Sequence, residues 1–352
     1  MVALMKEEDT EITPDGRPGI REAESIIEIA GLEKQYPAGK SKAVDGNSFA
    51  VRRGEIFGLL GPNGAGKTTT IGILTTRILP TAGRAIVAGI DVVHDPVRIK
   101  PHIAVVPQRN NLDRALTARQ NLTFHAAYFG VARKERNERA MRLLKQFGLE
   151  GREKEKVDTY SGGMAQRLLI ARALMHMPDM LFLDEPTRAL DPQSRLFLWE
   201  MIETLNRQGL TVFITTHDMD EATRLCHRVA IMDHGKILEL DTPENLSRIV
   251  PSGTRIELRI QPDADRPLTE EKKEQILSSI LSLWGVTRGE WTTARPPGNE
   301  PMLRLYADRG GELAVQAARH VLDEGFALAD LHLVKPSLED VFIHLTGKGL
   351  RN

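Results

Sequence analysis

The residues that decide the fold are Gly61-Pro62-Asn63-Gly64-Ala65-Gly66-Lys67-Thr68, which match G-x-x-x-x-G-K-[ST], the pattern of a phosphate-binding P-loop. The loop follows residues 55–60, expected to be a short buried strand, and precedes an expected helix at 69–79. Glycines allow backbone N–H groups to face phosphate oxygens, Lys67 adds a positive charge, and the Thr68 hydroxyl is a Mg²⁺ ligand. The sequence therefore predicts a nucleotide site at a helix N-terminus; this context disfavours a chance match by a glycine-rich turn.

Two carboxylates end another apolar run, Met180–Leu183. A buried strand would hold Asp184 at its end, where it can orient the Mg²⁺ shell. Glu185 follows, and strand alternation would point it to the other side, placed to polarise a water that attacks the γ-phosphate. The alternative is a solvated strand end, which a wholly apolar run disfavours.

Two further apolar runs end in polar side chains. His217 follows the run 210–216, and its imidazole could hydrogen-bond the γ-phosphate and the attacking water. Gln108 follows the run 105–107, and its amide could reach Mg²⁺ or water. Taken alone, His217 would be a structural or exposed histidine and Gln108 an ordinary loop residue.

A serine and two glycines precede a predicted helix at 165–175. An isolated Ser-Gly-Gly is an ordinary helix start with serine as the cap. Here it lies between the P-loop and the carboxylate strand, in the segment Tyr160-Ser161-Gly162-Gly163-Met164-Ala165-Gln166.

These motifs, in this order, resemble those of the ATP-binding cassette (ABC) ATPases over about residues 25–245. The resemblance identifies Gln108 as the Q-loop glutamine, 180–185 as the Walker B strand with the catalytic Glu185, and His217 as the switch histidine. It assigns the signature to Ser161, Gly162, Gly163, Met164 and Gln166, and the D-loop to Ala189, Leu190 and Asp191. It implies catalytic roles for Glu185, His217 and Gln108, and metal contacts for Thr68, Gln108 and Asp184.

The resemblance also implies where the nucleotide lies. Two copies would pair head to tail, with each ATP between the P-loop of one copy and the Ser161 signature of the other. Tyr36 matches the aromatic residue on which adenine stacks, and Thr69 extends the nucleotide-binding set beyond the P-loop. The other interpretation of Tyr36 is a surface tyrosine at a strand end.

Two residues depart from the common pattern of the family. Met164 stands where many members have glutamine, although methionine is common in exporters. Arg188 stands where a small or polar residue is usual. Its charge could pair with a carboxylate, approach phosphate or be solvated, and the sequence does not choose between these.

Composition sets further limits. A chain of 352 residues is long enough for two domains, and its net charge of −1 argues against a generic nucleic-acid binder. Cys226 is the only cysteine, which excludes a disulfide within the chain and fits a reducing cytoplasm. No apolar run approaches the roughly 20 residues of a transmembrane helix.

The predicted fold class is α/β: a P-loop cassette with a mainly parallel sheet, a β-rich subdomain and a helical subdomain, followed by a small α+β domain. We expect a flexible tail at 1–24, the cassette at 25–250, and an accessory domain at 251–352 beginning near Pro251-Ser252-Gly253. Strands at 254–260, 285–292, 301–307 and 328–334, helices at 269–284 and 311–324, and a hairpin loop at 294–299 give the βαββαβ order of a ferredoxin-like domain, in which we expect no chemistry.

The end of the chain, residues 335–347, resembles the tail of daunorubicin-resistance-type and nodulation-type exporter ATPases, as does the segment 105–113. The leading hypothesis is therefore an ATP-hydrolysing homodimer, with ATP and Mg²⁺, that powers an ABC-2 exporter through a separate permease at the cytoplasmic face of the inner (plasma) membrane. The permease would contact residues 109–119, and no nucleic-acid partner is expected. The alternatives are an importer ATPase with a regulatory C-terminal domain, and a soluble ABC ATPase acting on DNA or ribosomes.

Overall fold

The computed structural model describes residues 24–37, 41–250, 254–261, 267–283, 285–293, 301–307, 310–334 and 336–347. The expected flexible tail, apart from Glu24, the boundary at 251–253 and the hairpin loop at 294–299 lie outside these residues. Two compact units are distinguished, the first formed by 1–59, 64–217 and 234–237 and the second by 60–63, 218–233 and 238–352. The expected domain limits stay a prediction.

An antiparallel sheet opens the chain, as the expected β-rich stretch requires. Its strand order is β2-β1-β4-β5, with bounds β1 (Ser25–Gln35), β2 (Lys42–Arg52), β4 (Ala82–Val87) and β5 (Ile90–Asp91). Residues on one face of β1, such as Ile27 and Ile29, are buried while Glu28 is exposed. This alternation is what a sheet with one wet face produces.

The second sheet contains the strands at whose ends Gln108, Asp184 and His217 lie. Its order is β10-β9-β3-β8-β7-β6, with bounds β3 (Ile56–Leu60), β6 (Ile103–Val106), β7 (Met180–Asp184), β8 (Thr211–Thr216), β9 (Arg228–Asp233) and β10 (Lys236–Asp241). β6, β7 and β8 run parallel, and every residue of β7 and β8 is buried. Continuous apolar runs without alternation are typical of parallel strands covered on both faces.

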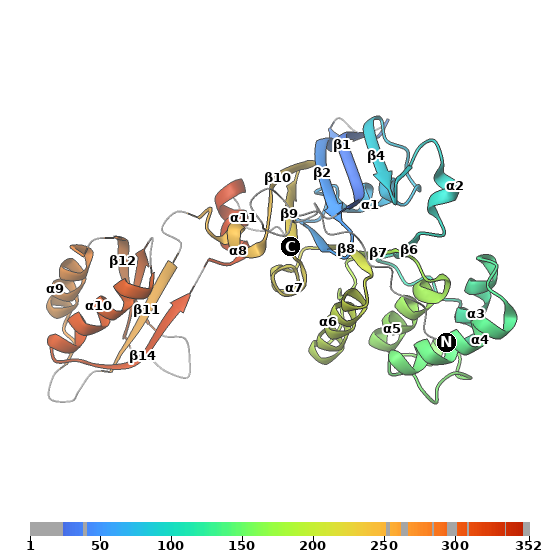
Figure 1. Ribbon diagram of the computed structural model, residues 1–352. Helices are drawn as coiled ribbons and strands as arrows, with labels where there is room; N and C mark the ends of the chain where they lie inside the picture. The colour runs from blue at the N-terminus through green and yellow to red at the C-terminus, as the bar shows by residue number, and fades with distance from the viewer. Residues whose placement is uncertain are drawn as a thin grey trace, which may run out of the picture. The chain divides into compact units, whose positions relative to one another are not determined.

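Helices follow in the expected order (Figure 1). Their bounds are α1 (Lys67–Leu74), α2 (Pro96–Ile99), α3 (Ala118–Tyr128), α4 (Arg133–Gln146), α5 (Gly162–Ala173), α6 (Pro192–Arg207), α7 (Met219–Leu225) and α8 (Pro243–Ser247), with 3₁₀ turns η1 (Val157–Thr159) and η2 (Leu174–His176). α3, α4 and α5 pack together as the expected helical subdomain.

The first helix is shorter than predicted. It ends at Leu74 rather than Leu79, because Thr76 adopts a left-handed conformation with φ of 62°. The chain then turns back, and the N–H of Ile78 donates to the carbonyl of Gly72 at 2.9 Å. A Cβ at Gly72 would lie 2.4 Å from Ile78 Cδ1, so the glycine makes room for the returning side chain. Ile78 is therefore apolar at helical spacing without being helical.

The C-terminal region has the predicted βαββαβ order. Its elements are β11 (Thr254–Gln261), α9 (Glu270–Leu281), β12 (Val286–Thr293), β13 (Pro301–Ala307), α10 (Gly310–Asp323) and β14 (Ala327–Val334), followed by α11 (Leu338–Thr346). The antiparallel sheet order β12-β13-β11-β14 is that of a ferredoxin-like fold.

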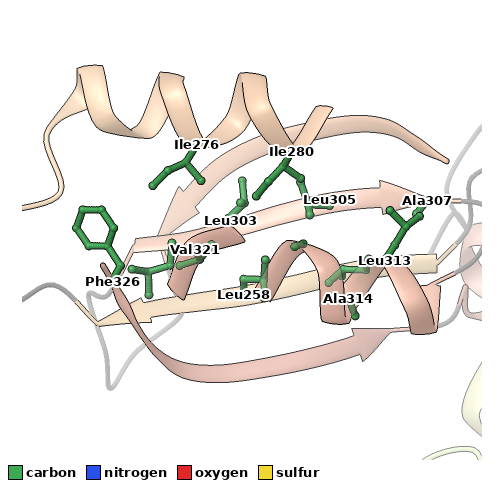
Figure 2. Packing of buried hydrophobic residues seen from close by; sticks show 13 residues of the cluster. Leu258, Ile276, Ile280, Leu303, Leu305, Ala307, Leu313, Ala314, Val321 and Phe326 are labelled. Carbon is green, nitrogen blue, oxygen red and sulfur yellow. The ribbon is translucent and has the colours of Figure 1, made fainter. Parts of the chain in front are cut away.

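The core of this region lies between one face of that sheet and its two helices. In Figure 2, Ile276 and Ile280 of α9 point at the sheet, where Leu303 and Leu305 of β13 meet them. Val321 belongs to the same buried cluster from α10. The period-2 pattern of the strands and the amphipathic pattern of the helices bury one common surface.

Candidate active site

The P-loop joins β3 to α1. Gly64 and Gly66 have φ of 84° and 112°, in the left-handed region that residues with a Cβ rarely occupy. Gly66 is the N-cap of α1, and its carbonyl accepts from the N–H of Thr70 at 2.9 Å. At Gly64 an added Cβ would meet nothing within 4 Å, so the conformation rather than the space requires glycine.

Lys67 and Glu185 form a buried ion pair at the start of α1. Lys67 Nζ lies 3.4 Å from Glu185 Oε1, and the two side chains are 5% and 6% exposed. Burial lowers the pKa of Lys67, against the opposing effect of Glu185. Burial alone would raise the pKa of Glu185, but the charges of Lys67 and His217, together with hydrogen bonds from Gln108 and Lys67, bring this pKa below its usual value. Each charge therefore stabilises the other in a place that disfavours both.

Glu185 gathers three more of the chain's polar side chains. Gln108 Nε2 donates to Oε2 at 2.8 Å, Arg188 Nη1 donates to the same oxygen at 3.3 Å, and His217 Nδ1 lies 3.5 Å from Oε1. The structure thus brings together Lys67, Gln108, Glu185 and His217, as the order of the motifs predicts. Arg188 pairs with a carboxylate, one of the three roles that the sequence left open.

Backbone geometry sets the direction of Glu185. Strand β7 ends at Asp184, and Glu185 adopts φ of 49°, so strand alternation no longer determines where its side chain points. Its N–H donates to the carbonyl of Thr215 at 3.0 Å. Asp184 and Glu185 both reach residues of the P-loop, Thr68 and Lys67, instead of facing opposite ways.

Asp184 is held by hydroxyl groups. Thr215 Oγ1 donates to Asp184 Oδ1 at 2.6 Å, and Thr68 Oγ1 lies 3.4 Å from the same oxygen. A carboxylate, a threonine hydroxyl and the amide oxygen of Gln108 are hard oxygen donors of the kind that Mg²⁺ prefers. The residues present therefore fit a magnesium ion.

Thr215 is a member of this site that the sequence reasoning missed. It is fully buried, and the register of the parallel pair β7–β8 places it directly beside Asp184. The signal was available: a hydroxyl two residues before His217, in the run that neighbours the carboxylate strand. Because Thr is also a common strand residue, its presence in the run does not by itself indicate a site.

Tyr36 lies beside the beginning of α1. Its hydroxyl is 3.4 Å from Thr69 Oγ1, and its side chain is exposed. Lys34 Nζ lies 5.2 Å from the centre of the ring. An exposed aromatic face next to the P-loop helix has the geometry that base stacking needs.

The signature and D-loop form a separate group of contacts. Ser161 is exposed and caps α5, where its Oγ accepts from the N–H of Met164 at 3.2 Å. A Cβ at Gly163 would lie 2.4 Å from Ser194 Oγ of α6. Asp191, the last D-loop residue, caps α6 by accepting from the N–H of Ser194 at 2.9 Å.

The remaining predicted residues lie in the same segments. Met164 and Gln166 are half-buried on α5, Gly162 begins that helix, and Ala189 has φ of 59° in the turn before Leu190. The N–H of Leu190 donates to the carbonyl of Thr187 at 3.1 Å. In the P-loop, Ala65 and Gly61 are buried while Asn63 is exposed and Pro62 half-buried.

Known proteins resemble this chain over most of its length. Residues 44–188 match the model of the ABC transporter family. The doxorubicin resistance ATP-binding protein DrrA of Mycobacterium tuberculosis (strain H37Rv) is 37% identical over 327 residues, which are 93% of this chain and 95% of that protein. The Nod factor export ATP-binding protein I of Ralstonia nicotianae is 36% identical over 337 residues, 95% of this chain and 98% of that protein.

Solved structures agree. A dimeric post-hydrolysis ATP-binding cassette bound to ADP and Pi has a TM-score of 0.57 and 28% sequence identity, and the match covers 61% of this chain and 98% of that one. The two relatives, 37% and 36% identical over 93% and 95% of this chain, establish the family. The chain belongs to the ABC transporter family, as an ATP-binding protein with the ATPase cassette fold.

Proposed function

We propose that this chain is the ATP-hydrolysing subunit of an ABC-2 type exporter, and that it powers export through a separate membrane permease. The observation that carries the proposal is the convergence of Lys67, Gln108 and His217 on the carboxylate of Glu185. The resemblance to drug-resistance and Nod-factor export proteins supports the export direction.

The chemistry follows from the site's own residues. A γ-phosphate bound by the P-loop would take Lys67 from Glu185, since the phosphate carries more negative charge than one carboxylate. Glu185, then relieved of Lys67, would accept a hydrogen bond from the attacking water and polarise it. His217 would hydrogen-bond the γ-phosphate, and Gln108 would orient the attacking water or the metal ion. Thr68, Asp184 and Gln108 would hold Mg²⁺, which when bound would neutralise phosphate charge.

The active unit would be a head-to-tail homodimer. Ser161 is exposed at the N-terminus of the twelve-residue helix α5, a position at which backbone N–H groups favour a phosphate. The dimeric state of the similar ADP-bound cassette supports this arrangement. Each ATP would then contact the P-loop, Tyr36 and Thr69 of one copy and the signature of the other.

The permease would dock on the helical subdomain. Residues 109–111 and 113–115 are exposed, whereas Leu112 and Ala118 are buried and fix the segment. Phe124 and Tyr128, four residues apart on α3, are 49% and 88% exposed, and grouped exposed apolar side chains favour a partner surface. Among the described residues, no helix is long and apolar enough to cross a membrane. We therefore propose a peripheral location on the cytoplasmic face of the inner membrane, through the permease.

The alternatives remain distinguishable. An importer ATPase with a regulatory C-terminal domain is disfavoured by the similarity of the chain to drug-resistance and Nod-factor export proteins over 93% and 95% of its length. An ABC ATPase acting on DNA or ribosomes would co-purify with nucleic acid.

Affinity purification of the tagged chain from gently solubilised membranes tests the proposal. Recovery of a stoichiometric multi-helix membrane protein, and ATP hydrolysis by the complex, are the expected results. Recovery of ribosomes or DNA instead would replace the export function with the third hypothesis.

Mixing experiments test the dimer. Ser161→Arg should keep ATP binding in the monomer and block closure of the dimer. Lys67→Ala should lose affinity for ATP by about 1.5–3 kcal/mol, the value of a charge-assisted contact. One interface of the mixed dimer then has an intact P-loop opposite an intact signature, so partial recovery of hydrolysis is expected. Wild-type hydrolysis by Ser161→Arg alone would contradict the head-to-tail arrangement.

A further inference from the structure

We propose that Arg188 is a positioning residue for Glu185: it holds the carboxylate by Oε2 and keeps it oriented when Lys67 turns to phosphate. The inference rests on the proposed function, in which Glu185 polarises the attacking water. It assigns a role to a residue that lies outside the motifs of the site.

Among the described residues, the side chains that contact the Glu185 carboxylate divide between its two oxygens. Lys67 and His217 lie at Oε1, at 3.4 and 3.5 Å. Gln108 and Arg188 donate to Oε2, at 2.8 and 3.3 Å. The carboxylate is thus held from two sides, and each oxygen has one cationic lysine or arginine.

Phosphate binding affects these two sides unequally. Lys67 belongs to the P-loop, so a bound γ-phosphate competes with Oε1 for its ammonium group. Arg188 lies outside the P-loop and its contact is with the other oxygen. After the exchange, Oε2 keeps both of its donors and Oε1 has lost the charge of Lys67. The oxygen released for water is then Oε1, while Oε2 remains fixed.

The contact of Arg188 with Glu185 is local in the sequence and is formed within one turn of the backbone. Arg188 follows Glu185 by three residues, and its own N–H donates to the carbonyl of Glu185 at 3.2 Å. Thr187, between them, is buried, and Ala189 turns the chain with φ of 59°. Arg188 therefore contacts Glu185 twice, through its backbone N–H and through its guanidinium group. Both residues lie in the connection between β7 and α6.

Exposure sets the size of the effect. The Arg188 side chain is 53% exposed while that of Glu185 is 6% exposed, so solvent screens the arginine but not the carboxylate. Half-exposed ion pairs contribute modestly. We therefore expect the loss of Arg188 to lower kcat about three- to fivefold rather than to abolish it.

The experiment compares full-length Arg188→Gln, Arg188→Lys and wild type in steady-state ATP hydrolysis with Mg²⁺. Arg188→Gln should lower kcat about three- to fivefold with KM for ATP changed less than about twofold, because the arginine acts on the carboxylate and not on the nucleotide. Arg188→Lys keeps the charge and should recover more than half of the wild-type kcat. A matched control is Arg98→Gln, which removes another (i, i+3) ion pair, with Asp95 at 3.6 Å, and should leave both constants unchanged.

Measuring dimer formation distinguishes a role of Arg188 in positioning Glu185 from a contact of Arg188 with the other copy of the chain. In the Glu185→Gln background, adding Arg188→Gln should leave the fraction of ATP-dependent dimer unchanged. A loss of dimer there, a rise in KM with constant kcat, or a kcat equal to or above the wild-type value would each overturn the inference. If instead Glu185→Gln alone hydrolyses ATP at the wild-type rate, the proposed function itself fails, which these measurements distinguish from a failure of the Arg188 role.

Discussion

Replacing Thr215 with valine tests how the site holds Asp184. The Thr215 side chain is fully buried, and its hydroxyl donates to Asp184 Oδ1 at 2.6 Å. A hydrogen bond to a charged group contributes about 1.5–3 kcal/mol, and the methyl group that replaces the hydroxyl recovers about 0.8 kcal/mol through apolar burial. The net expected loss of unfolding free energy is therefore about 0.7–2 kcal/mol. The N–H of Glu185 loses its longer contact with Thr215 Oγ1 at 3.3 Å but keeps its 3.0 Å bond to the Thr215 carbonyl, so the backbone of the site is retained.

The assay combines urea unfolding with a Mg²⁺ titration of ATP hydrolysis. Thr215→Val should raise the Mg²⁺ concentration at half-maximal rate by about tenfold, the size typical for groups that orient a metal ligand. The control is Thr211→Val on the same strand, where an equally buried hydroxyl accepts from the neutral N–H of Gly54 at 2.9 Å. It should cost about 1 kcal/mol of stability and leave the Mg²⁺ requirement unchanged. An unchanged Mg²⁺ requirement in Thr215→Val, or an equal shift in both variants, would refute the reasoning.

Two further predictions concern the signature and the stacking of the adenine base on Tyr36. Gly163→Ala should lower both the rate of ATP hydrolysis and the stability of the protein, because the alanine Cβ would lie 2.4 Å from Ser194 Oγ. Adding Ser194→Gly to the same chain should restore the rate and the stability. Failure of this rescue would show that the clash is not the cause. Tyr36→Ala should weaken ATP binding by about 1–3 kcal/mol in equilibrium titration. Tyr36→Phe keeps the ring and loses only the contact with Thr69, so it should retain most of the affinity for ATP. Equal losses of affinity in the two variants would argue against stacking.

Much of the site could be predicted because parallel strands end at one edge. Asp184 is the last residue of β7, Gln108 and His217 come just after β6 and β8, and these three strands are parallel neighbours. Apolar runs that each end in a polar residue are therefore enough to place the side chains near one another, before any register is known. The ferredoxin-like region was predictable for a similar reason, since its two periodicities change cleanly along the chain.

What could not be predicted depends on single backbone conformations. The direction of Glu185 follows from its φ of 49°, which no residue pattern specifies. The same is true of the end of α1, where Thr76 at φ of 62° stops a helix that apolar spacing would continue. The pairing of Arg188 with Glu185 follows from the turn between them, so a sequence shows only that an arginine is near a carboxylate.

The central claim is that Glu185 is the carboxylate on which ATP hydrolysis depends. The most direct measurement compares ATP hydrolysis and ATP-dependent dimer formation in the wild type and in Glu185→Gln. The amide keeps the size of the side chain but cannot polarise water as a carboxylate does. The account predicts that Glu185→Gln binds ATP, forms a stable dimer in its presence and turns over at least about a hundredfold more slowly, the smallest effect expected for loss of a general base. Hydrolysis by Glu185→Gln at the wild-type rate would contradict the claim.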